Sequence, residues 1–443
     1  MIRYSEILME VIDITHNDYA GWDEKLGWGH PEIYLKKIER LEDKQEMTPQ
    51  KFVEIVNDYL VSFQDRHMYF LLEGLDNVKA STFGFRVRRY NDALYVTETI
   101  EENRFPKGSK VISIDNQTIE ELITSKRYLL KETSAEREDW SNIINKSSFI
   151  KIENENGQHI KFDLKKYEPV RRKKESLLTA INEKTLLMTL PSFIDVEAIL
   201  DFVQNHEEEL KACTNLIIDV RKNNGGNGQA FSTLLKYIFP HSERPNSEVK
   251  LREFNCTNRN SNLFIQLCHN ARKNINDKGT LSVLDFAEEQ FEAYRGQGFV
   301  AFDFSNLLGE EVFEIEGTDL PRKVIVMSDS YCASAGEQFI ETCMESSKVT
   351  VIGRATMGVN DYSDLVVKDW DNMFSLYYPV SRIVQKTLND PLHGKGIQPH
   401  HYIPWTPEHI QKDLDLLNAL EILQAEHNTV ERKLFNKHPY SLK

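Results

Sequence analysis

The first 80 residues alternate apolar and polar positions with the period of a helix. An apolar stripe with acidic residues between its members begins the chain, and residues 31–41 continue in the same way. Thr48, Pro49 and Gln50 predict an N-cap, a proline at the first helical position and the first turn of a further helix. The apolar residues that follow have i, i+3, i+4 spacing: Phe52, Ile55, Val56, Tyr59 and Leu60. We therefore expect a helical domain over residues 1–80.

Residues 81–168 change to the two-residue period of strands. The segments 83–90 and 93–100 alternate, and Asn91 and Asp92 between them are typical of a turn. A further strand is expected at Lys110–Ile114, and residues 149–164 predict a hairpin with Asn156 and Gly157 at its tip. This pattern favours a small β domain. The basic stretch 170–174 that follows is interpreted as a solvated linker.

From residue 176 to the end, apolar runs alternate with helical segments. Strands are expected at 185–190, 215–220, 324–327, 349–353 and 373–380, and helices at 196–206, around 231–238 and from Pro407 onward with Thr406 as N-cap. Fully apolar strands that alternate with helices indicate an α/β sandwich with a largely parallel sheet. Residues of about 240–315 are polar and helical in pattern, and we interpret them as an insertion into this third domain, 176–443.

Three short motifs carry candidate chemistry. The stretch 323–344 predicts a strand, a tight turn and a helix, which is a geometry that exposes Ser334 beside a helix N-terminus. The glycine-rich turn 223–228 follows an apolar strand and presents backbone N–H groups that suit an oxyanion. His67 lies near or just past a helix end and suits a general base at neutral pH.

Each motif also has a structural interpretation. Ser334 would serve as an ordinary N-cap, because serine accepts from the amides of the first helical turn. The glycines would form a plain left-handed turn, and His67 would bind the last carbonyls of its helix. Taken one at a time, these interpretations are favoured, and only the ordered combination of the motifs changes the balance.

Composition narrows the class of partner. The 443 residues carry a net charge of −15, which argues against a nucleic-acid backbone or an anionic membrane as partner. Five scattered cysteines without a C-x-x-C pair predict a reducing compartment and neither a disulfide frame nor a zinc site. The N-terminal segment has acidic residues where a signal peptide needs an apolar core, so we expect a cytoplasmic protein. No cofactor or metal is implied.

Taken together and in order, the motifs resemble those of the S41 peptidases, the C-terminal processing and tricorn-core type. The matching stretches are Asp65-Arg66-His67-Met68, the β-rich segments 83–100 and 107–122, the run 217–226, Ser334-Ala335-Gly336-Glu337, the set Gly353, Thr356 and Gly358, and Gly394-Lys395-Gly396-Ile397-Gln398-Pro399. Each motif is weak, but the ordered set covers most of the chain.

The resemblance implies a multi-domain α/β protein. Its parts are the helical N-terminal domain 1–80, a PDZ-like β domain 81–168 and an α/β-sandwich peptidase core with ClpP/crotonase-like layers over 176–443. It implies a serine endopeptidase or peptidase acting on peptide or unfolded protein substrates. It also implies Ser334 as nucleophile, with an oxyanion hole of the N–H of Ala335 and of Gly225 or Gly226. A homo-oligomer and peptide binding by the PDZ-like region are left open.

The two branches of the family differ in the residue that serves as general base. In the processing branch a lysine follows the glycine–threonine motif, where this chain has Val359, so the chain is nearer the tricorn-like branch with His67 as base. That branch uses a glutamate where this chain has His393, and His400 stands where an aspartate is usual. The third member of the catalytic network is therefore open between His393, Asp390 and another residue. A lysine base would require Lys395 or Lys348 to move towards Ser334.

Two alternatives remain at this stage. The missing lysine and His393 suggest a catalytically weak or inactive peptide-binding scaffold on the same fold. An acyl-CoA hydratase-like enzyme is a third hypothesis, because related sheets with glycine oxyanion turns handle thioesters.

Overall fold

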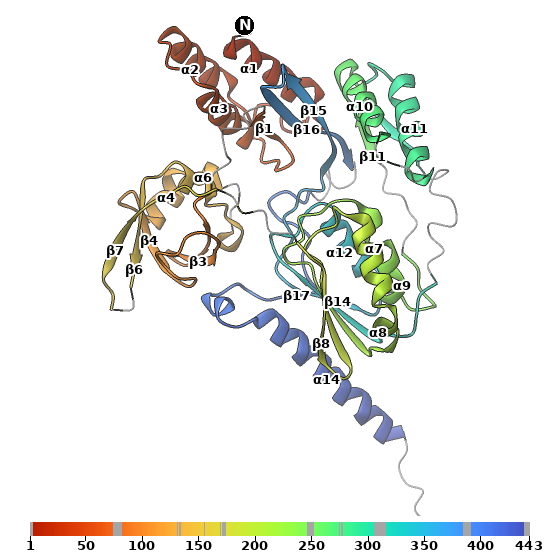
Figure 1. Ribbon diagram of the computed structural model, residues 1–443. Helices are drawn as coiled ribbons and strands as arrows, with labels where there is room; N and C mark the ends of the chain where they lie inside the picture. The colour runs from red at the N-terminus through yellow and green to blue at the C-terminus, as the bar shows by residue number, and fades with distance from the viewer. Residues whose placement is uncertain are drawn as a thin grey trace, which may run out of the picture.

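Three β-sheets, each with its own helices, make up the protein (Figure 1). The computed structural model describes residues 3–437 apart from 74–81, 131, 133, 155, 169, 171–173, 246–251, 274, 276–277, 305–315 and 384–390. The multi-domain α/β class predicted from the sequence is confirmed. None of the described helices combines the length and the apolar character that a membrane span requires.

The central sheet has six strands in the order β17-β14-β13-β10-β9-β8. Their bounds are β8 Leu177–Asn182, β9 Thr185–Thr189, β10 Asn215–Asp219, β13 Lys323–Ser328, β14 Val349–Gly353 and β17 His401–Tyr402. Strand β8 pairs antiparallel with β9, and every other neighbour pair is parallel. The expected parallel sheet is therefore confirmed, with one antiparallel edge strand.

Helices cover both faces of the central sheet, which explains why its strands are apolar without alternation. The helices are α7 Val196–Asn205, α8 Glu207–Ala212, α9 Leu235–Ile238, α12 Ala335–Met344 and α14 Leu414–Lys437. On β10, Leu216 and Ile218 pack into the cluster of α7, α9 and α12, whereas Ile217 faces the cluster that includes Ala419 and Leu423 of α14. The helix expected from Pro407 is a 3₁₀ turn, Pro407–Ile410, and the regular helix begins at Leu414.

The second sheet, ordered β2-β3-β4-β6-β7 with β5 beside β4, is antiparallel. Its elements are β2 Phe85–Tyr90, β3 Ala93–Thr99, β4 Lys110–Ile114, β5 Gln117–Thr118, β6 Phe149–Glu153 and β7 His159–Asp163, with helices α4 Ile119–Ser125, α5 Arg127–Leu130 and α6 Ser141–Asn145. The strands expected from the two-residue period are confirmed. Their shared core includes Leu94, Val111, Trp140 and Ile150.

The third sheet joins segments that are far apart in the sequence. It runs β1-β16-β11-β12 with β15 beside β16. Its elements are β1 Tyr69–Leu72, β11 Arg252–Asn255, β12 Phe299–Phe302, β15 Tyr362–Trp370 and β16 Phe374–Ile383, and the helices near it are α1 Tyr4–Asp13, α2 Pro31–Asp43, α3 Pro49–Val61, α10 Asn258–Ala271 and α11 Lys278–Ala293. Figure 1 shows α1–α3 beside β15 and β16.

Strands β1, β11 and β12 were not expected from the sequence. Each has four residues. Short runs of this kind have too few positions to separate a strand from a helix by period alone. They form because β15 covers one edge of β16 and the other edge pairs with β1 and then β11, so the pairing is decided by residues about 300 and 130 positions away.

Candidate active site

Two turns meet at the carboxyl edge of the central sheet. Strands β10 and β13 are parallel neighbours with Asp219 opposite Met327, so the turns that follow them leave from the same edge. A Cβ added to Gly225, whose φ is +96°, would lie 2.6 Å from the Cβ of Ser334. Only glycine permits this approach. The sheet therefore brings together the glycine turn and the serine that the sequence singled out.

Ser334 has an unusual backbone conformation for a residue with a side chain, with φ 55° and ψ −122°. It occupies the N-cap position of α12, but its side chain makes no capping hydrogen bond. The interpretation of Ser334 as a side-chain N-cap is therefore wrong. Its carbonyl oxygen instead accepts from the amide of Glu337 at 2.8 Å and from Nδ2 of Asn360 at 2.9 Å. Strain of this kind is typical of sites where a side chain must be presented for chemistry.

The neighbouring amides differ in what they can still bind. The Gly225 N–H donates to Oδ1 of Asn223 at 2.9 Å. Within the described residues, no hydrogen bond from the N–H of Ala335 or of Gly226 is present. Gly226 is fixed by a bridge to Phe193, whose backbone would be 2.1 Å from an added Cβ. Of the donors expected from the sequence, Ala335 and Gly226 remain available for an oxyanion, whereas Gly225 is already engaged.

His67 lies past the end of α3, in the connection to β1. Its Nδ1 is 2.9 Å from the carbonyl oxygen of Tyr362. A carbonyl oxygen can only accept, so Nδ1 carries the proton and Nε2 has the free lone pair. The His67 N–H donates to Oδ1 of Asp65 at 2.8 Å, and the Tyr19 hydroxyl donates to Oδ2 at 2.8 Å. The imidazole is thus held in the tautomer that a general base needs.

Glu337, one helical turn after Ser334, is a fully buried carboxylate. It accepts hydrogen bonds from Oγ1 of Thr356 at 2.5 Å, from the amide of Gly358 at 2.6 Å and from the amide of Val359 at 3.0 Å. Burial raises the pKa of Glu337, and these hydrogen bonds and the charge of His67 oppose the rise. His67 is therefore within electrostatic reach of the first turn of α12.

One segment, residues 356–362, contacts Glu337, Ser334 and His67. Thr356, Gly358 and Val359 bind Glu337, Asn360 binds the Ser334 carbonyl, and Tyr362 binds the His67 ring. Its Val359 side chain is buried and 7% exposed, where a processing-type enzyme has its lysine. Lys348 is directed elsewhere, because its Nζ donates to the carbonyl of Thr318. The 356–362 segment therefore links Glu337, Ser334 and His67 through its backbone and side chains.

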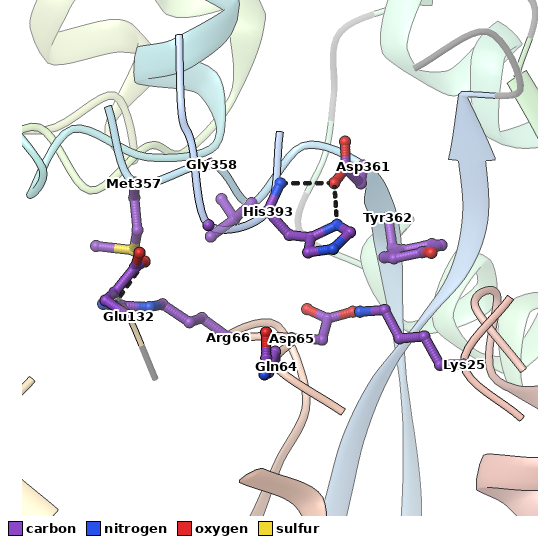
Figure 2. A pocket seen from close by; sticks show the side chains of 12 residues that line it. Lys25, Gln64, Asp65, Arg66, Glu132, Met357, Gly358, Asp361, Tyr362 and His393 are labelled. Atoms are coloured by element: carbon purple, nitrogen blue, oxygen red, sulfur yellow. Dashed lines mark hydrogen bonds and ion pairs between the residues drawn. The ribbon is translucent and has the colours of Figure 1, made fainter. Parts of the chain in front are cut away.

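His393 belongs to a second group beside this segment. Its Nδ1 lies 3.2 Å from Oδ2 of Asp361, whose carboxylate also accepts from the amides of Leu392 and His393 at 2.8–3.0 Å. Although burial would raise it, these hydrogen bonds hold the pKa of Asp361 below its usual value. Figure 2 shows the His393 ring in a small cavity with Lys25 and Asp65 on the opposite side. Ser334 and His67 do not line this cavity.

Lys25 is the buried cation of this cavity. Its Nζ donates to the carbonyl of Phe63 at 2.7 Å and lies 4.6 Å from the centre of the Tyr362 ring. Burial lowers the pKa of Lys25, while Asp65 and Asp361 act in the opposite direction.

Asn360, Asp361 and Lys25 were not predicted from the sequence as residues of the site. The polar pair Asn360 and Asp361, which begins two residues after Gly358 of the glycine–threonine motif, was the available signal. Asp390 lies outside the described residues, and His400 accepts from the Val351 amide at 2.9 Å.

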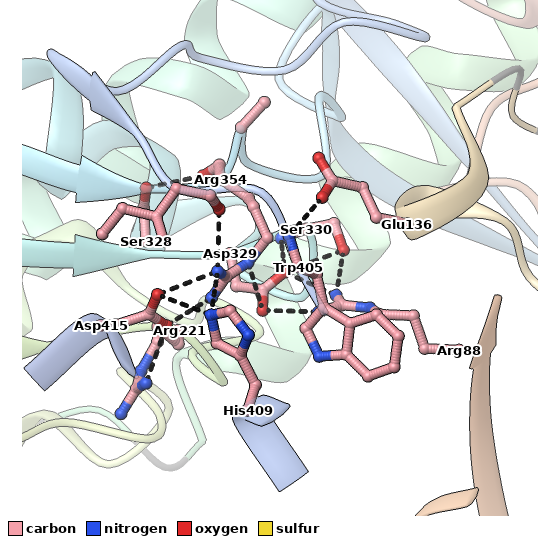
Figure 3. Close-up of polar contacts among 12 residues, drawn as sticks. Arg88, Glu136, Arg221, Ser328, Asp329, Ser330, Arg354, Trp405, His409 and Asp415 are labelled. Atoms are coloured by element: carbon pink, nitrogen blue, oxygen red, sulfur yellow. Dashed lines mark hydrogen bonds and ion pairs between the residues drawn. The ribbon is translucent and has the colours of Figure 1, made fainter. Parts of the chain in front are cut away.

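A chain of buried ion pairs anchors the turn that carries Ser334 (Figure 3). Asp329, the first residue after β13, is bound by Arg88 of β2 at 2.6 and 3.0 Å and by Arg354 at 3.1 Å. Arg354 continues to Asp415 of α14 at 2.5 and 2.9 Å, and Asp415 is also 2.9 Å from Arg221. Although burial opposes it, Arg88 and Arg354 hold the pKa of Asp329 well below the usual range, and His409, Arg354 and Arg221 do the same for the pKa of Asp415.

Comparison with known proteins identifies the family of the core. The model of peptidase family S41 matches residues 184–403. Among solved structures, mature CPAF complexed with lactacystin has a TM-score of 0.62 at 11% identity, covering 98% of this chain and 99% of that one. Mature CPAF and its s499a mutant each have a TM-score of 0.61 at 11% identity, covering 92% of this chain and 94% of the other. At this identity the likeness concerns the fold. A search of curated protein sequences finds no match.

Replacing Glu337 should loosen the 356–362 segment. In Glu337→Gln one amide oxygen must replace two carboxylate oxygens, and the Nε2 group would face backbone N–H donors. We expect a loss of about 1–3 kcal/mol in the free energy of unfolding, measured by chemical denaturation, and faster hydrogen exchange at Gly358 and Val359. Glu345→Gln, on the exposed end of the same helix, is the matched control. Unchanged exchange at both amides would contradict the anchoring role.

The ion-pair chain predicts a pH-dependent stability. Asp415→Asn removes the buried carboxylate that Arg354 and Arg221 share, so we expect about 3 kcal/mol of destabilisation at pH 7 by thermal or urea unfolding. Because the folded pKa of Asp415 is depressed, its stabilisation is complete above the unfolded pKa of about 3.9 and is lost as pH falls through the folded value. The difference from wild type should therefore narrow below about pH 4.

Asp413→Asn is the control for this experiment. Asp413 also binds Arg221, but its side chain is 40% exposed, so we expect less than about 1 kcal/mol. Equal losses for the two variants would contradict the importance of burial.

Proposed function

Because the chain belongs to peptidase family S41 through residues 184–403, we propose that this serine peptidase uses Ser334 as its nucleophile. The observation that carries the proposal is the strained Ser334 at the start of α12, packed against Gly225 and with a side chain that caps nothing. A serine hydroxyl in this position is free to attack a peptide carbonyl. The substrate is a peptide or an unfolded protein segment.

His67 is the proposed general base. Its Nδ1–H is bound by the Tyr362 carbonyl, so Nε2 is the nitrogen that takes the Ser334 proton. The alkoxide oxygen then bonds to the carbonyl carbon, and the negative charge moves to the former carbonyl oxygen. His67 returns the proton to the leaving amine as the C–N bond breaks. Water, activated by His67 in the same way, hydrolyses the acyl-enzyme and regenerates Ser334.

The proposed oxyanion hole consists of the Ala335 and Gly226 N–H groups. Ala335 is the first residue of α12, so the positive end of the helix dipole adds to its donor. Removing one donor of this kind from an enzyme costs about 3–4 kcal/mol of transition-state stabilisation. The Gly225 amide is not assigned to this role, since it already donates to Asn223.

The imidazolium that forms on His67 needs a negative partner. We assign this role to the Glu337 carboxylate, with which His67 interacts electrostatically, and to the Tyr362 carbonyl that accepts from Nδ1. His393 is assigned a supporting role, because it contacts Asp361 rather than the catalytic pair. The second sheet is proposed to be PDZ-like and to bind an extended peptide by strand addition at β2 or β7, its two edge strands.

Removing the nucleophile or the base should abolish cleavage. Ser334→Ala and His67→Ala should each lower kcat by about 10⁴–10⁶-fold, since members of such a unit act together. Turnover of a quenched fluorescent peptide library measures the effect. Ser347→Ala and His269→Ala, both at exposed positions, are the matched controls and should retain activity. A Ser334→Ala enzyme that cleaves like wild type would overturn the assignment.

Labelling separates the peptidase from an inactive scaffold. A fluorophosphonate probe should modify wild type at Ser334, modify His67→Ala far more slowly and leave Ser334→Ala unlabelled, as read by mass spectrometry. Wild type that remains unlabelled under conditions in which a control serine hydrolase reacts would favour the scaffold.

His393 should matter less than His67. His393→Ala and Asp361→Asn remove a contact that supports the 356–362 segment, so we expect kcat to fall by about 3–30-fold with little change in KM. Steady-state kinetics on one peptide measures both constants. A loss as large as that of His67→Ala would place His393 in the catalytic machinery instead.

A further inference from the structure

Three basic side chains from separate parts of the chain gather beside the proposed catalytic turns. Arg86 lies on β2, Lys174 precedes β8 and Lys222 follows β10. Burial lowers the pKa of Lys174, and the nearby charges of Arg86 and Lys222 lower it further, so the three cations repel one another. We call Arg86, Lys174 and Lys222 the basic cluster.

One carboxylate only partly neutralises the basic cluster. Glu98 lies 3.4 Å from Nε of Arg86 and 3.4 Å from Nζ of Lys222. Lys174 has no carboxylate partner within the described residues. Arg88, two residues along β2, is not part of the cluster, since Asp329 binds it with two oxygens. The side chains of Arg86 and Lys222 are 59% and 72% exposed, so a ligand can reach them.

The basic cluster is connected to the proposed catalytic turns by short stretches of chain. Lys222 is three residues before Gly225, which packs against Ser334. The Arg86 guanidinium lies 6.0 Å from the centre of the Tyr331 ring, and Tyr331 is three residues before Ser334. Three residues of chain span at most about 10–11 Å. An extended substrate covers the same distance with about three residues.

We propose that the basic cluster binds a carboxylate of the peptide substrate, about three residues from the scissile bond. The inference rests on the proposed peptidase function and adds a substrate preference to it. In a chain with a net charge of −15, an acidic peptide is repelled in general, so a local excess of cations at the site has a selective effect. The carboxylate is supplied by an acidic side chain or by the peptide's C-terminus.

Binding to Ser334→Ala tests the preference without requiring cleavage. Fluorescein-labelled octapeptides with one Glu or one Gln, scanned along the peptide, would be measured by fluorescence anisotropy. At 50 mM salt we expect the best Glu peptide to bind about 5–20-fold more tightly than its Gln counterpart, with the difference shrinking to about 2-fold at 0.5 M salt. Amidated and free C-termini on the Gln peptide show whether a terminal carboxylate binds equally well.

Variants of the basic cluster identify the residues responsible. Lys174→Gln and Lys222→Gln should each reduce the Glu preference by about 3-fold, and Glu98→Gln should increase it by a similar factor because it frees two cations. Lys184→Gln is the matched control. Lys184 is an exposed lysine before β9, at the opposite end of the same parallel sheet, and its variant should behave like wild type.

The outcomes separate the two proposals. Equal binding of Glu and Gln peptides, or a preference that Lys174→Gln and Lys222→Gln leave intact, overturns the basic cluster as a carboxylate site. Kinetics of wild type on the same peptides should show the preference in KM with kcat unchanged. A preserved Glu preference in binding together with no cleavage by wild type would overturn the peptidase mechanism and support the carboxylate site.

Discussion

The buried carboxylate of Glu337 is the constraint on which the arrangement of the site depends. A charge in this position is tolerated only if donors surround it, and here a hydroxyl and two backbone amides do so. Those donors come from Thr356, Gly358 and Val359, so satisfying one charge fixes the path of the segment up to Tyr362. Burial of Glu337 thereby determines where the Ser334 carbonyl and the His67 ring find their partners.

The same constraint explains how a strained serine can persist. A positive φ at a residue with a Cβ costs roughly 1–3 kcal/mol and is kept only when the surroundings over-determine it. Asn360 holds the Ser334 carbonyl from one side, the first turn of α12 holds it from another, and the ion pairs of Asp329 fix the start of the turn. These surrounding contacts therefore offset the cost of the strained backbone that presents the Ser334 hydroxyl.

The sequence predicts the parts of this structure that local periods determine. The strands β9, β10, β13 and β14 were expected within about two residues, because both faces of the central sheet are covered and their residues are apolar throughout. The conformation of Ser334 was not predictable, since its pattern suits a cap equally well. Asn360 and Asp361 were missed because their partners lie 26 and 32 residues away. Contacts of that range leave no period in the chain.

The family pattern has a lysine where this chain has Val359 and a glutamate where it has His393. These two differences weigh less against the proposed peptidase mechanism than the sequence alone suggests. A histidine base, the role proposed for His67, requires a fixed tautomer and negative charge nearby when the imidazole is protonated. The Tyr362 carbonyl meets the first requirement, and Glu337 is placed to meet the second from within α12. Because Val359 also donates its amide to Glu337, the position that holds a lysine elsewhere is used here to hold the carboxylate in place. The backbone of Val359 is thus part of the packing that keeps Glu337 beside the first turn of α12.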